Sequence, residues 1–201
     1  MKIDIQDIKF WMDAIRNSED RDRTLESFWG GQLKSKTWLI DVLEKHYHIS
    51  NVEIVIHGGW NGVLASLLFN STIGIKHITS IDMDPSCEKI ASTINKRQEI
   101  AGKFKAITGD MCDYDYTGTN PYYIINTSCE HITTEQYSRW IENIPEGCKI
   151  VLQSNDYSDL EEHINCHNSL QDFEKWAKIK VEHAEELQLE KYKRFLLIGT
   201  V

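Results

Sequence analysis

The spacing of apolar residues divides the chain into two parts near residue 50. Before this point, apolar residues recur at helical spacing around Ile5–Ile15 and again around Trp38–Leu43. The polar, charged stretch Asn17–Arg23 predicts a break after the first helix. Between the helices lies Phe28–Gln32, whose two adjacent glycines are not expected inside a regular helix. The pattern predicts a helical N-terminal extension over residues 1–50.

Beyond residue 50, short β-branched runs alternate with segments of helical spacing. Strands are predicted at Val52–Ile56, His77–Ile81, Lys105–Thr108, Tyr122–Asn126, Cys148–Gln153, Ile179–Glu190 and Arg194–Val201. Helices are predicted at Val63–Phe69, Pro85–Ala101, Thr133–Asn143 and Leu170–Ala177. Asp84 is expected to cap the second of these helices, with Pro85 as its first residue. The alternation predicts an α/β fold with a mostly parallel sheet, in one compact domain over residues 51–201.

Composition narrows the choice of partner and compartment. The chain has 201 residues, and 22 basic against 31 acidic side chains give a net charge of −9, which disfavours a nucleic-acid partner. No apolar run approaches the roughly 20 residues that a membrane span needs. Met1–Ile5 is too polar for a signal peptide. Five cysteines without a CxxC pair indicate free thiols and a cytoplasmic location. Oligomeric state is not predicted.

Ligands of such sheets bind at the carboxyl ends of the strands, so the residues just after each strand are the candidates for chemistry. The first strand is followed by Gly58-Gly59-Trp60-Asn61-Gly62, where glycines let the backbone approach a ligand or simply form a tight turn. Asp82 ends the second strand about twenty residues later, a position that suits hydrogen bonds to ribose hydroxyls. Asp84 is better explained as the helix cap.

The third and fourth strands end in further polar residues. Asp110 precedes Met111, and a carboxylate beside an apolar side chain can read the amino edge of adenine while the apolar group packs on the ring. The alternative for Asp110 is a turn-initiating aspartate. The fourth strand runs into Asn126-Thr127-Ser128-Cys129-Glu130-His131-Ile132.

In this order and spacing, the strand ends resemble those of the class I, Rossmann-like, S-adenosylmethionine-dependent methyltransferases of the small-molecule type, over about Val52–Val201. The resemblance implies a seven-stranded, mostly parallel sheet with an antiparallel C-terminal hairpin. It also implies S-adenosyl-L-methionine as the cofactor. The positions that it assigns to cofactor binding are Gly58, Gly59, Trp60, Asn61, Asp82, Met83, Asp110, Met111, Asn126 and Ser128.

Two positions depart from the pattern of that family. Ile56 stands two places before the first glycine, where the family usually has an acidic residue, and Trp60 replaces its central glycine. Either the ammonium group of the methionine part is held by other groups, or the site is altered. Trp60 either stacks over the ligand or belongs to the core.

The segment Phe28–Lys36 precedes the sheet and is, by resemblance, a lid over the cofactor. Trp29 and Gln32 are then candidates to contact cofactor or substrate, and Lys36 to meet a carboxylate. The alternative is a hydrophobic anchor that packs the N-terminal helices on the sheet.

Candidate acids and bases follow the fourth and fifth strands. Glu130-His131-Ile132 resembles a Glu-His-hydrophobic sequence common in small-molecule members of the family. His163, in the polar segment after the fifth strand, is a candidate general base near neutral pH, with Asn155 orienting the substrate. A structural histidine at His131 and a hydrogen-bonded loop around His163 are the plain alternatives.

No metal is predicted. His163, Cys166 and His167 lie close in sequence, but they lack a second cysteine pair and are too few for a structural zinc site.

The favoured function is therefore methyl transfer from S-adenosylmethionine to a small molecule. The fourth strand does not end in the Asn-Pro-Pro-Tyr sequence associated with methylation of nucleic-acid bases, so a nucleic-acid methyltransferase is a lesser alternative. The altered loop leaves open a protein that binds S-adenosylmethionine or S-adenosylhomocysteine without transferring the methyl group. A nicotinamide-dependent oxidoreductase is disfavoured because the loop is not GxGxxG.

Overall fold

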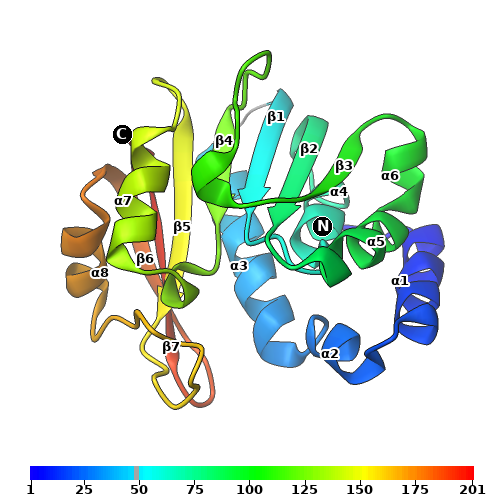
Figure 1. Cartoon of the computed structure of the whole chain (residues 1–201), viewed down its shortest axis with the longest axis horizontal. Coiled ribbons are helices and arrows are strands. Elements are labelled where there is room, and N and C mark those ends of the chain that lie inside the picture. The colour runs from blue at the N-terminus through cyan, green and yellow to red at the C-terminus, as the bar shows by residue number, and fades with distance from the viewer. Residues whose placement is uncertain (48–49) are drawn as a thin grey trace. The chain divides into compact units, whose positions relative to one another are not determined.

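The computed structural model describes residues 1–47 and 50–201, and its contacts group the chain into two compact units, Met1–Asp110 and Met111–Val201 (Figure 1). The first unit contains α1 (Ile5–Asn17), α2 (Arg21–Glu26), α3 (Gly30–His46), β1 (Ser50–His57), α4 (Val63–Phe69), β2 (Gly74–Asp82), α5 (Pro85–Ile94), α6 (Lys96–Ile100) and β3 (Phe104–Thr108). The second contains η1 (Met111–Asp113), β4 (Tyr123–Asn126), η2 (Cys129–His131), α7 (Thr134–Glu142), β5 (Lys149–Asn155), α8 (Leu170–Ala177), β6 (Lys180–Gln188) and β7 (Lys193–Thr200).

The contacts divide the chain at a different place from the boundary expected near residue 50, because α1 to α3 belong to the same unit as the first three strands. The extension over residues 1–50 and the domain over residues 51–201 stay predictions.

The described strands follow the order β3-β2-β1-β4-β5-β7-β6. Strands β1, β2 and β3 pair in parallel, as do β4 and β5, whereas β7 is antiparallel to both β5 and β6. The long β6–β7 hairpin is drawn in orange and red in Figure 1. This arrangement confirms the predicted α/β, Rossmann-like sheet with an antiparallel C-terminal hairpin.

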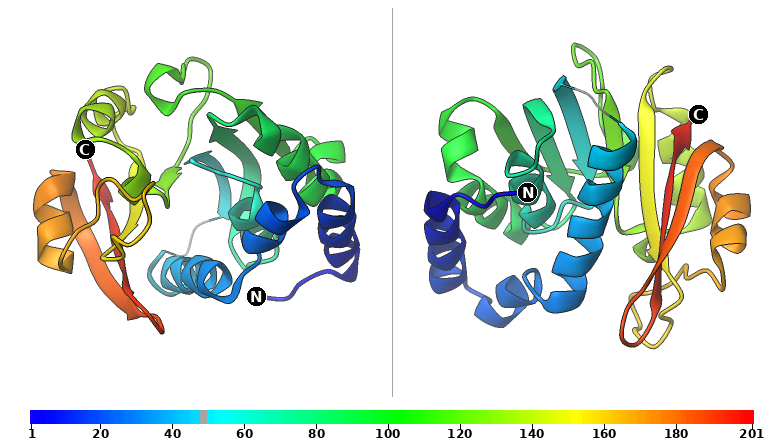
Figure 2. Two further views of the ribbon diagram at one scale, coloured as in Figure 1. Left: turned by 60° about the horizontal axis from the view of Figure 1, so that its bottom comes forward. Right: turned by 180° about the vertical axis from the view of Figure 1, so that it is seen from behind.

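In the first unit, the N-terminal helices pack on the helices that follow the strands. Figure 2 shows α1 lying beside α5, in agreement with their contacts. Trp11 of α1 is buried, and its indole Nε1 donates to Ser66 Oγ of α4 at 2.9 Å. Asp4 caps α1 by accepting a hydrogen bond from Gln6 N. The polar tip of a buried tryptophan thus has a partner, as such side chains require.

The ends of the N-terminal helices can be compared with the prediction. The predicted break after the first helix is present, since α1 ends at Asn17, but it is shorter than Asn17–Arg23, because Asp20 accepts a hydrogen bond from Arg23 N and α2 starts at Arg21. The glycine pair of Phe28–Gln32 opens α3, with Trp29 as its N-cap residue. The first-turn N–H groups of a helix have no intrahelical partner, so two glycines disturb this turn less than they would the middle of the helix.

The predicted helix Pro85–Ala101 is broken at Asn95 into α5 and α6. Asn95 is buried, and its side-chain Nδ2 donates to the carbonyl oxygens of Gly62 and Ala91, each at 3.0 Å. The break therefore ties the helix to the loop after β1. The predicted cap is confirmed, because Asp84 accepts from Ser86 N and Pro85 is the first helical residue.

In the second unit, α7 and α8 lie side by side. The Tyr137 hydroxyl donates to Ala177 O at 2.7 Å, and its ring lies 4.0 Å from the ring of Trp176. A capping box between Thr133 and Gln136 starts α7. These contacts pack two amphipathic helices together, and α8 also contacts β6 and β7.

Two expectations from composition can be compared with the structure. All five cysteines are free, as predicted. Within the described ranges, every helix is too short or too polar to span a membrane.

Gly62 offers a direct test of how the loop packs on α5. Its φ is +73°, and a Cβ placed there would lie 2.8 Å from Asn95 Nδ2 and 2.9 Å from Ala91 Cβ. Gly62→Ala combines a left-handed backbone with a steric clash, so we expect a loss of about 2–4 kcal/mol in the free energy of unfolding. Urea denaturation measures this loss.

Gly102→Ala is the matched control, because Gly102 has φ +71° but no atom within 4 Å of the added Cβ. This variant is expected to lose about 1–2 kcal/mol in the free energy of unfolding, because it has the cost of the left-handed backbone without the steric clash. Equal losses in the two variants would contradict the packing role of Gly62.

Candidate functional site

The loop after β1 is a left-handed turn held by Asp82. Gly58, Trp60 and Gly62 have φ values of 62°, 46° and 73°. The backbone N–H of Trp60 donates to Asp82 Oδ2 at 2.7 Å. A left-handed conformation costs a residue with a side chain about 1–2 kcal/mol, and this charge-assisted hydrogen bond offsets that cost. Trp60 thus keeps a backbone conformation suited to glycine, and the departure from the family pattern concerns its side chain.

The glycines of the loop have packing reasons of their own. A Cβ on Gly59 would lie 2.0 Å from Ser80 Oγ, and Gly59 N donates to Ile81 O at 3.0 Å, so the loop runs directly against β2. Gly62 N in turn donates to Gly59 O at 2.9 Å. The Gly-rich sequence therefore reflects close approach of the loop to β2 and α5 at these two positions.

Asp82 is half-buried and retains acceptor capacity. Its Oδ2 accepts from Trp60 N, and its Oδ1 accepts from Asp84 N at 3.0 Å. A carboxylate offers about four lone-pair sites, so two further donors, such as a pair of neighbouring hydroxyls, can still bind.

Asp110 lies at the same end of the first unit's strands as Asp82. Asp82 pairs with Thr108 across β2 and β3, and Gly109 N donates to Asp82 O at 2.9 Å. Asp110 follows directly and is exposed. The register thus brings together two of the carboxylates that the sequence singled out.

Two uncharged residues, Met83 and Asn61, are the remaining candidates for cofactor binding that directly follow β2 or lie in the loop after β1. Met83 is 72% exposed, an unusual position for a large apolar side chain directly after a buried strand. Asn61 is 1% exposed, and neither its side-chain nitrogen nor its oxygen has a hydrogen-bond partner. A buried amide without a partner carries a free-energy penalty of about 1–3 kcal/mol, which a ligand with matching groups would relieve.

His57 ends β1 and was not singled out from the sequence. It is fully buried, and this burial lowers its pKa to about 3, although the nearby Asp110 carboxylate acts in the opposite direction. The imidazole is therefore neutral at physiological pH. Its position immediately before the glycine loop was the signal that could have identified it.

The predicted lid residues Trp29, Gln32 and Lys36 also belong to the first unit. Trp29 is 71% exposed at the start of α3. One turn apart on that helix, Lys36 Nζ donates to Gln32 Oε1 at 2.5 Å. Gln32 and Lys36 therefore share one face of α3.

The remaining cofactor candidates lie in the second unit. Asn126 is buried, its Oδ1 accepts from Ser128 N at 2.8 Å, and its Nδ2 lies 3.5 Å from Met111 Sδ. The structure thus brings Met111, Asn126 and Ser128 together at the end of β4.

Glu130 is buried in a polar network of the second unit. Its Oε1 accepts from Asn155 Nδ2 at 2.8 Å and from Arg194 Nη1 at 2.5 Å, while Arg194 Nη2 donates to Thr127 O. Its second oxygen, Oε2, is buried without a hydrogen-bond partner. Asn155, singled out as a substrate contact, is engaged on its other side as well, since its Oδ1 accepts from Tyr157 N at 2.8 Å.

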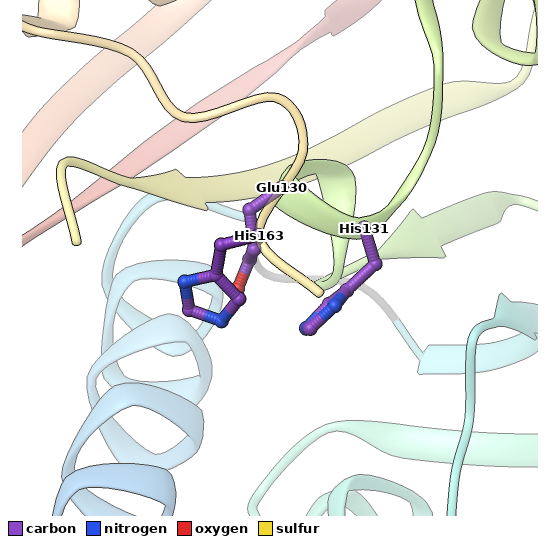
Figure 3. Close-up of side chains that lie close together, drawn as sticks. All are labelled: Glu130, His131 and His163. Carbon is purple, nitrogen blue, oxygen red and sulfur yellow. The ribbon is translucent and has the colours of Figure 1, made fainter. Parts of the chain in front are cut away.

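His131 and His163 lie beside Glu130 (Figure 3). Because carbonyl oxygens only accept, His131 Nδ1 donates to Glu162 O at 3.0 Å and His163 Nδ1 donates to Tyr157 O at 2.5 Å. The two rings are nearly perpendicular, with centroids 4.7 Å apart. Three candidate acids or bases that the sequence proposed one by one thus form a single cluster, which we call the Glu130–His131–His163 cluster.

Cys166 and His167 contact residues outside the Glu130–His131–His163 cluster. Cys166 Sγ lies 3.2 Å from Tyr157 O. The ring of His167 packs against Phe173 and Trp176, and burial lowers the pKa of His167. Of the three residues weighed for zinc, only His163 joins a group of potential metal ligands among the described residues.

Comparisons with known proteins place the fold. No protein-family model matches the chain, and a search of curated proteins finds no match. Solved structures do match. Magnesium protoporphyrin IX methyltransferase from Synechocystis, crystallised with S-adenosylmethionine, has a TM-score of 0.64 at 13% identity, covering 96% of this chain and 91% of its own.

Two other solved structures have the same fold. Geranyl diphosphate C-methyltransferase from Streptomyces coelicolor has a TM-score of 0.63 at 9% identity, covering 94% of this chain and 87% of its own. A TehB-like S-adenosylmethionine-dependent methyltransferase from Corynebacterium glutamicum has a TM-score of 0.58 at 13% identity, covering 83% and 86%. The chain therefore has the Rossmann-like fold of class I methyltransferases, as the sequence predicted.

The buried His57 predicts a pH-dependent stability. Its pKa is about 3 in the folded protein. In the unfolded chain it is about 6.5, so the unfolded state takes up a proton that the folded state does not. The contribution of the neutral His57 to the free energy of unfolding is fully present above pH 6.5 and declines as the pH falls toward 3. Between about pH 7.5 and about pH 5.5, we expect His57 to account for a loss of about 1.4 kcal/mol.

His57→Gln removes the titrating group at similar length, and urea denaturation at both pH values measures the difference. The variant should lose about 1.4 kcal/mol less than the wild type over this interval. An unchanged pH dependence would show that His57 is not held neutral by burial.

Proposed function

We propose that the chain is a class I methyltransferase that transfers the methyl group of S-adenosyl-L-methionine to a small molecule. The observation that carries this proposal is the bond between the left-handed loop and Asp82, at 2.7 Å, in a chain that has the methyltransferase fold. The carboxylate then serves both the loop and, with its free lone pairs, the ribose of the cofactor.

The residues of the first unit fit the cofactor. Asp82 would accept from the ribose hydroxyls, and the exposed Met83 would cover the adenine. Asp110 would accept from the adenine amino group. The loop Gly58–Gly62 would meet the methionine part, where the buried amide of Asn61 lacks partners. Met111, Asn126 and Ser128 of the second unit stay further candidates for contact with the cofactor.

The bound cofactor supplies a methyl group that its sulfonium already activates, so the protein's task is to orient the acceptor and remove its proton. The Glu130–His131–His163 cluster is our candidate for the proton acceptor. With Nδ1 donating to a carbonyl, each neutral histidine has its lone pair on Nε2. Arg194 and Asn155 hold Glu130 in place.

A small-molecule acceptor is favoured by the net charge of −9 and by two structural neighbours, magnesium protoporphyrin IX methyltransferase and geranyl diphosphate C-methyltransferase, which are named for small acceptors. Trp29, Gln32 and Lys36 are proposed to contact the acceptor. The buried Asn155 is proposed to act on it through Glu130. The five free cysteines support a cytoplasmic location.

A second candidate is a protein that binds S-adenosylmethionine or S-adenosylhomocysteine without methyl transfer. The half-buried Trp60, in place of a family glycine, favours it. The two candidates share the cofactor and differ in the reaction.

Cofactor binding is tested by Asp82→Asn. The amide oxygen can still accept from Trp60 N, so the loop is retained, but the amide nitrogen cannot accept from Asp84 N, and the charge that strengthens bonds to hydroxyls is lost. We expect S-adenosylhomocysteine to raise the Tm of the wild type, and its Kd to increase about tenfold or more in the variant, since a bond to a charged group contributes about 1.5–3 kcal/mol. Thermal shift and calorimetric titration measure both.

Glu88→Gln is the matched control. Glu88 Oε2 also accepts from a backbone N–H at a strand end, that of Thr108 at 2.8 Å, but it is not among the proposed ligands of the cofactor. The Kd of S-adenosylhomocysteine should be the same for Glu88→Gln as for the wild type. If the wild type shows no shift with either form of the cofactor, the proposal fails.

Methyl transfer itself is tested by incubating the wild type with S-adenosylmethionine and pooled metabolites. Formation of S-adenosylhomocysteine above the level of the Asp82→Asn variant is the expected result. Tight cofactor binding with no product across broad pools would favour the second candidate.

A further inference from the structure

The Glu130–His131–His163 cluster has the composition of a metal site. Each of its side chains offers one potential ligand atom, and these atoms lie within 4.8 Å of one another (Figure 3). Ligand atoms around a tetrahedral first-row ion lie about 3.3 Å apart. Because His131 is exposed and His163 half-buried, small side-chain rotations can close this difference.

Both histidines are oriented as metal ligands usually are. A metal-binding histidine donates its other ring N–H to a carbonyl or carboxylate, which sets the tautomer and the ring plane. His131 makes this bond to Glu162 O at 3.0 Å, and His163 makes it to Tyr157 O at 2.5 Å. Both imidazoles thus already make the hydrogen bond that commonly orients a metal-binding histidine.

Glu130 supplies an independent sign of a missing partner. The side chain is 3% exposed, and Oε2 has no hydrogen-bond partner, while Oε1 is bound by Asn155 and Arg194. An unpaired buried acceptor carries a free-energy penalty, and a cation bound at Oε2 would remove it. The Arg194 guanidinium, 2.5 Å from Oε1, opposes a cation here.

We propose that Glu130, His131 and His163 form a binding site for one divalent transition-metal ion, such as Mn²⁺, Fe²⁺ or Zn²⁺. Two imidazole nitrogens and one carboxylate oxygen suit these ions, whereas Mg²⁺ and Ca²⁺ prefer oxygen ligands throughout. Three protein ligands leave coordination positions open for water or an oxygen of a substrate. This site departs from the sequence prediction of a metal-free chain, because Glu130 and His131 are distant in sequence from His163.

The test is a titration of the untagged wild-type protein with Mn²⁺, followed by loss of the electron paramagnetic resonance signal of the free ion. Mn²⁺ is the probe because it binds poorly to the cysteine thiols. We expect one bound ion per chain. His131→Gln and His163→Gln should each weaken binding about tenfold or more, the range seen even for the loss of outer-shell partners. Both substitutions are at accessible side chains, so circular dichroism should report intact folding.

His77→Gln is the matched control, since His77 Nδ1 also lies 3.1 Å from a carbonyl oxygen, that of Gly102, in the first unit, and His77 does not belong to the cluster. Its affinity for Mn²⁺ should equal that of the wild type. Absence of binding to the wild type at millimolar Mn²⁺, or equal effects of the three substitutions, would overturn the proposal. Because the readout is the metal alone, failure here leaves cofactor binding through Asp82 unaffected.

Discussion

The hydrogen bond from Trp60 N to Asp82 is the interaction on which the candidate cofactor site depends. It joins the loop after β1 to the end of β2. Trp60 has a left-handed backbone, which is unfavourable for a residue with a side chain. The same carboxylate accepts from Asp84 N, the first residue of the turn that leads into α5. One side chain therefore sets the conformation of two strand-to-helix connections and still has lone pairs directed elsewhere.

The second unit uses a carboxylate at a strand end in a different way. Glu130 is buried and paired with Arg194, and removing one partner of such a buried pair typically costs about 3–5 kcal/mol. Asn155 adds a second donor to the same oxygen. This network holds Glu130 in position with one oxygen unsatisfied. Glu130 is therefore a candidate for proton transfer when no metal is bound, or for metal binding, and the two roles exclude each other because they use the same lone pair.

The glycine loop shows that one sequence signal can have two physical causes. Glycines after the first strand were interpreted as room for a ligand. Gly59 and Gly62 are needed because Ser80 and Ala91 lie within about 3 Å of where a Cβ would be. A tight fit against β2 and α5 positions the loop, and the proposed contact with a ligand would follow from that position.

The sequence by itself determined the alternation of strands and helices, the cap at Asp84, and the carboxylates at strand ends, because apolar periodicity and capping act over a few residues. It missed the break at Asn95, where distant packing decides the outcome. Only the tertiary structure decided that Trp60 N is bound by Asp82, 22 residues away, and that Arg194 pairs with Glu130, 64 residues away. It also gathered His131 and His163 beside Glu130, since contacts of this range depend on how the chain folds back on itself and leave no periodic trace in the sequence.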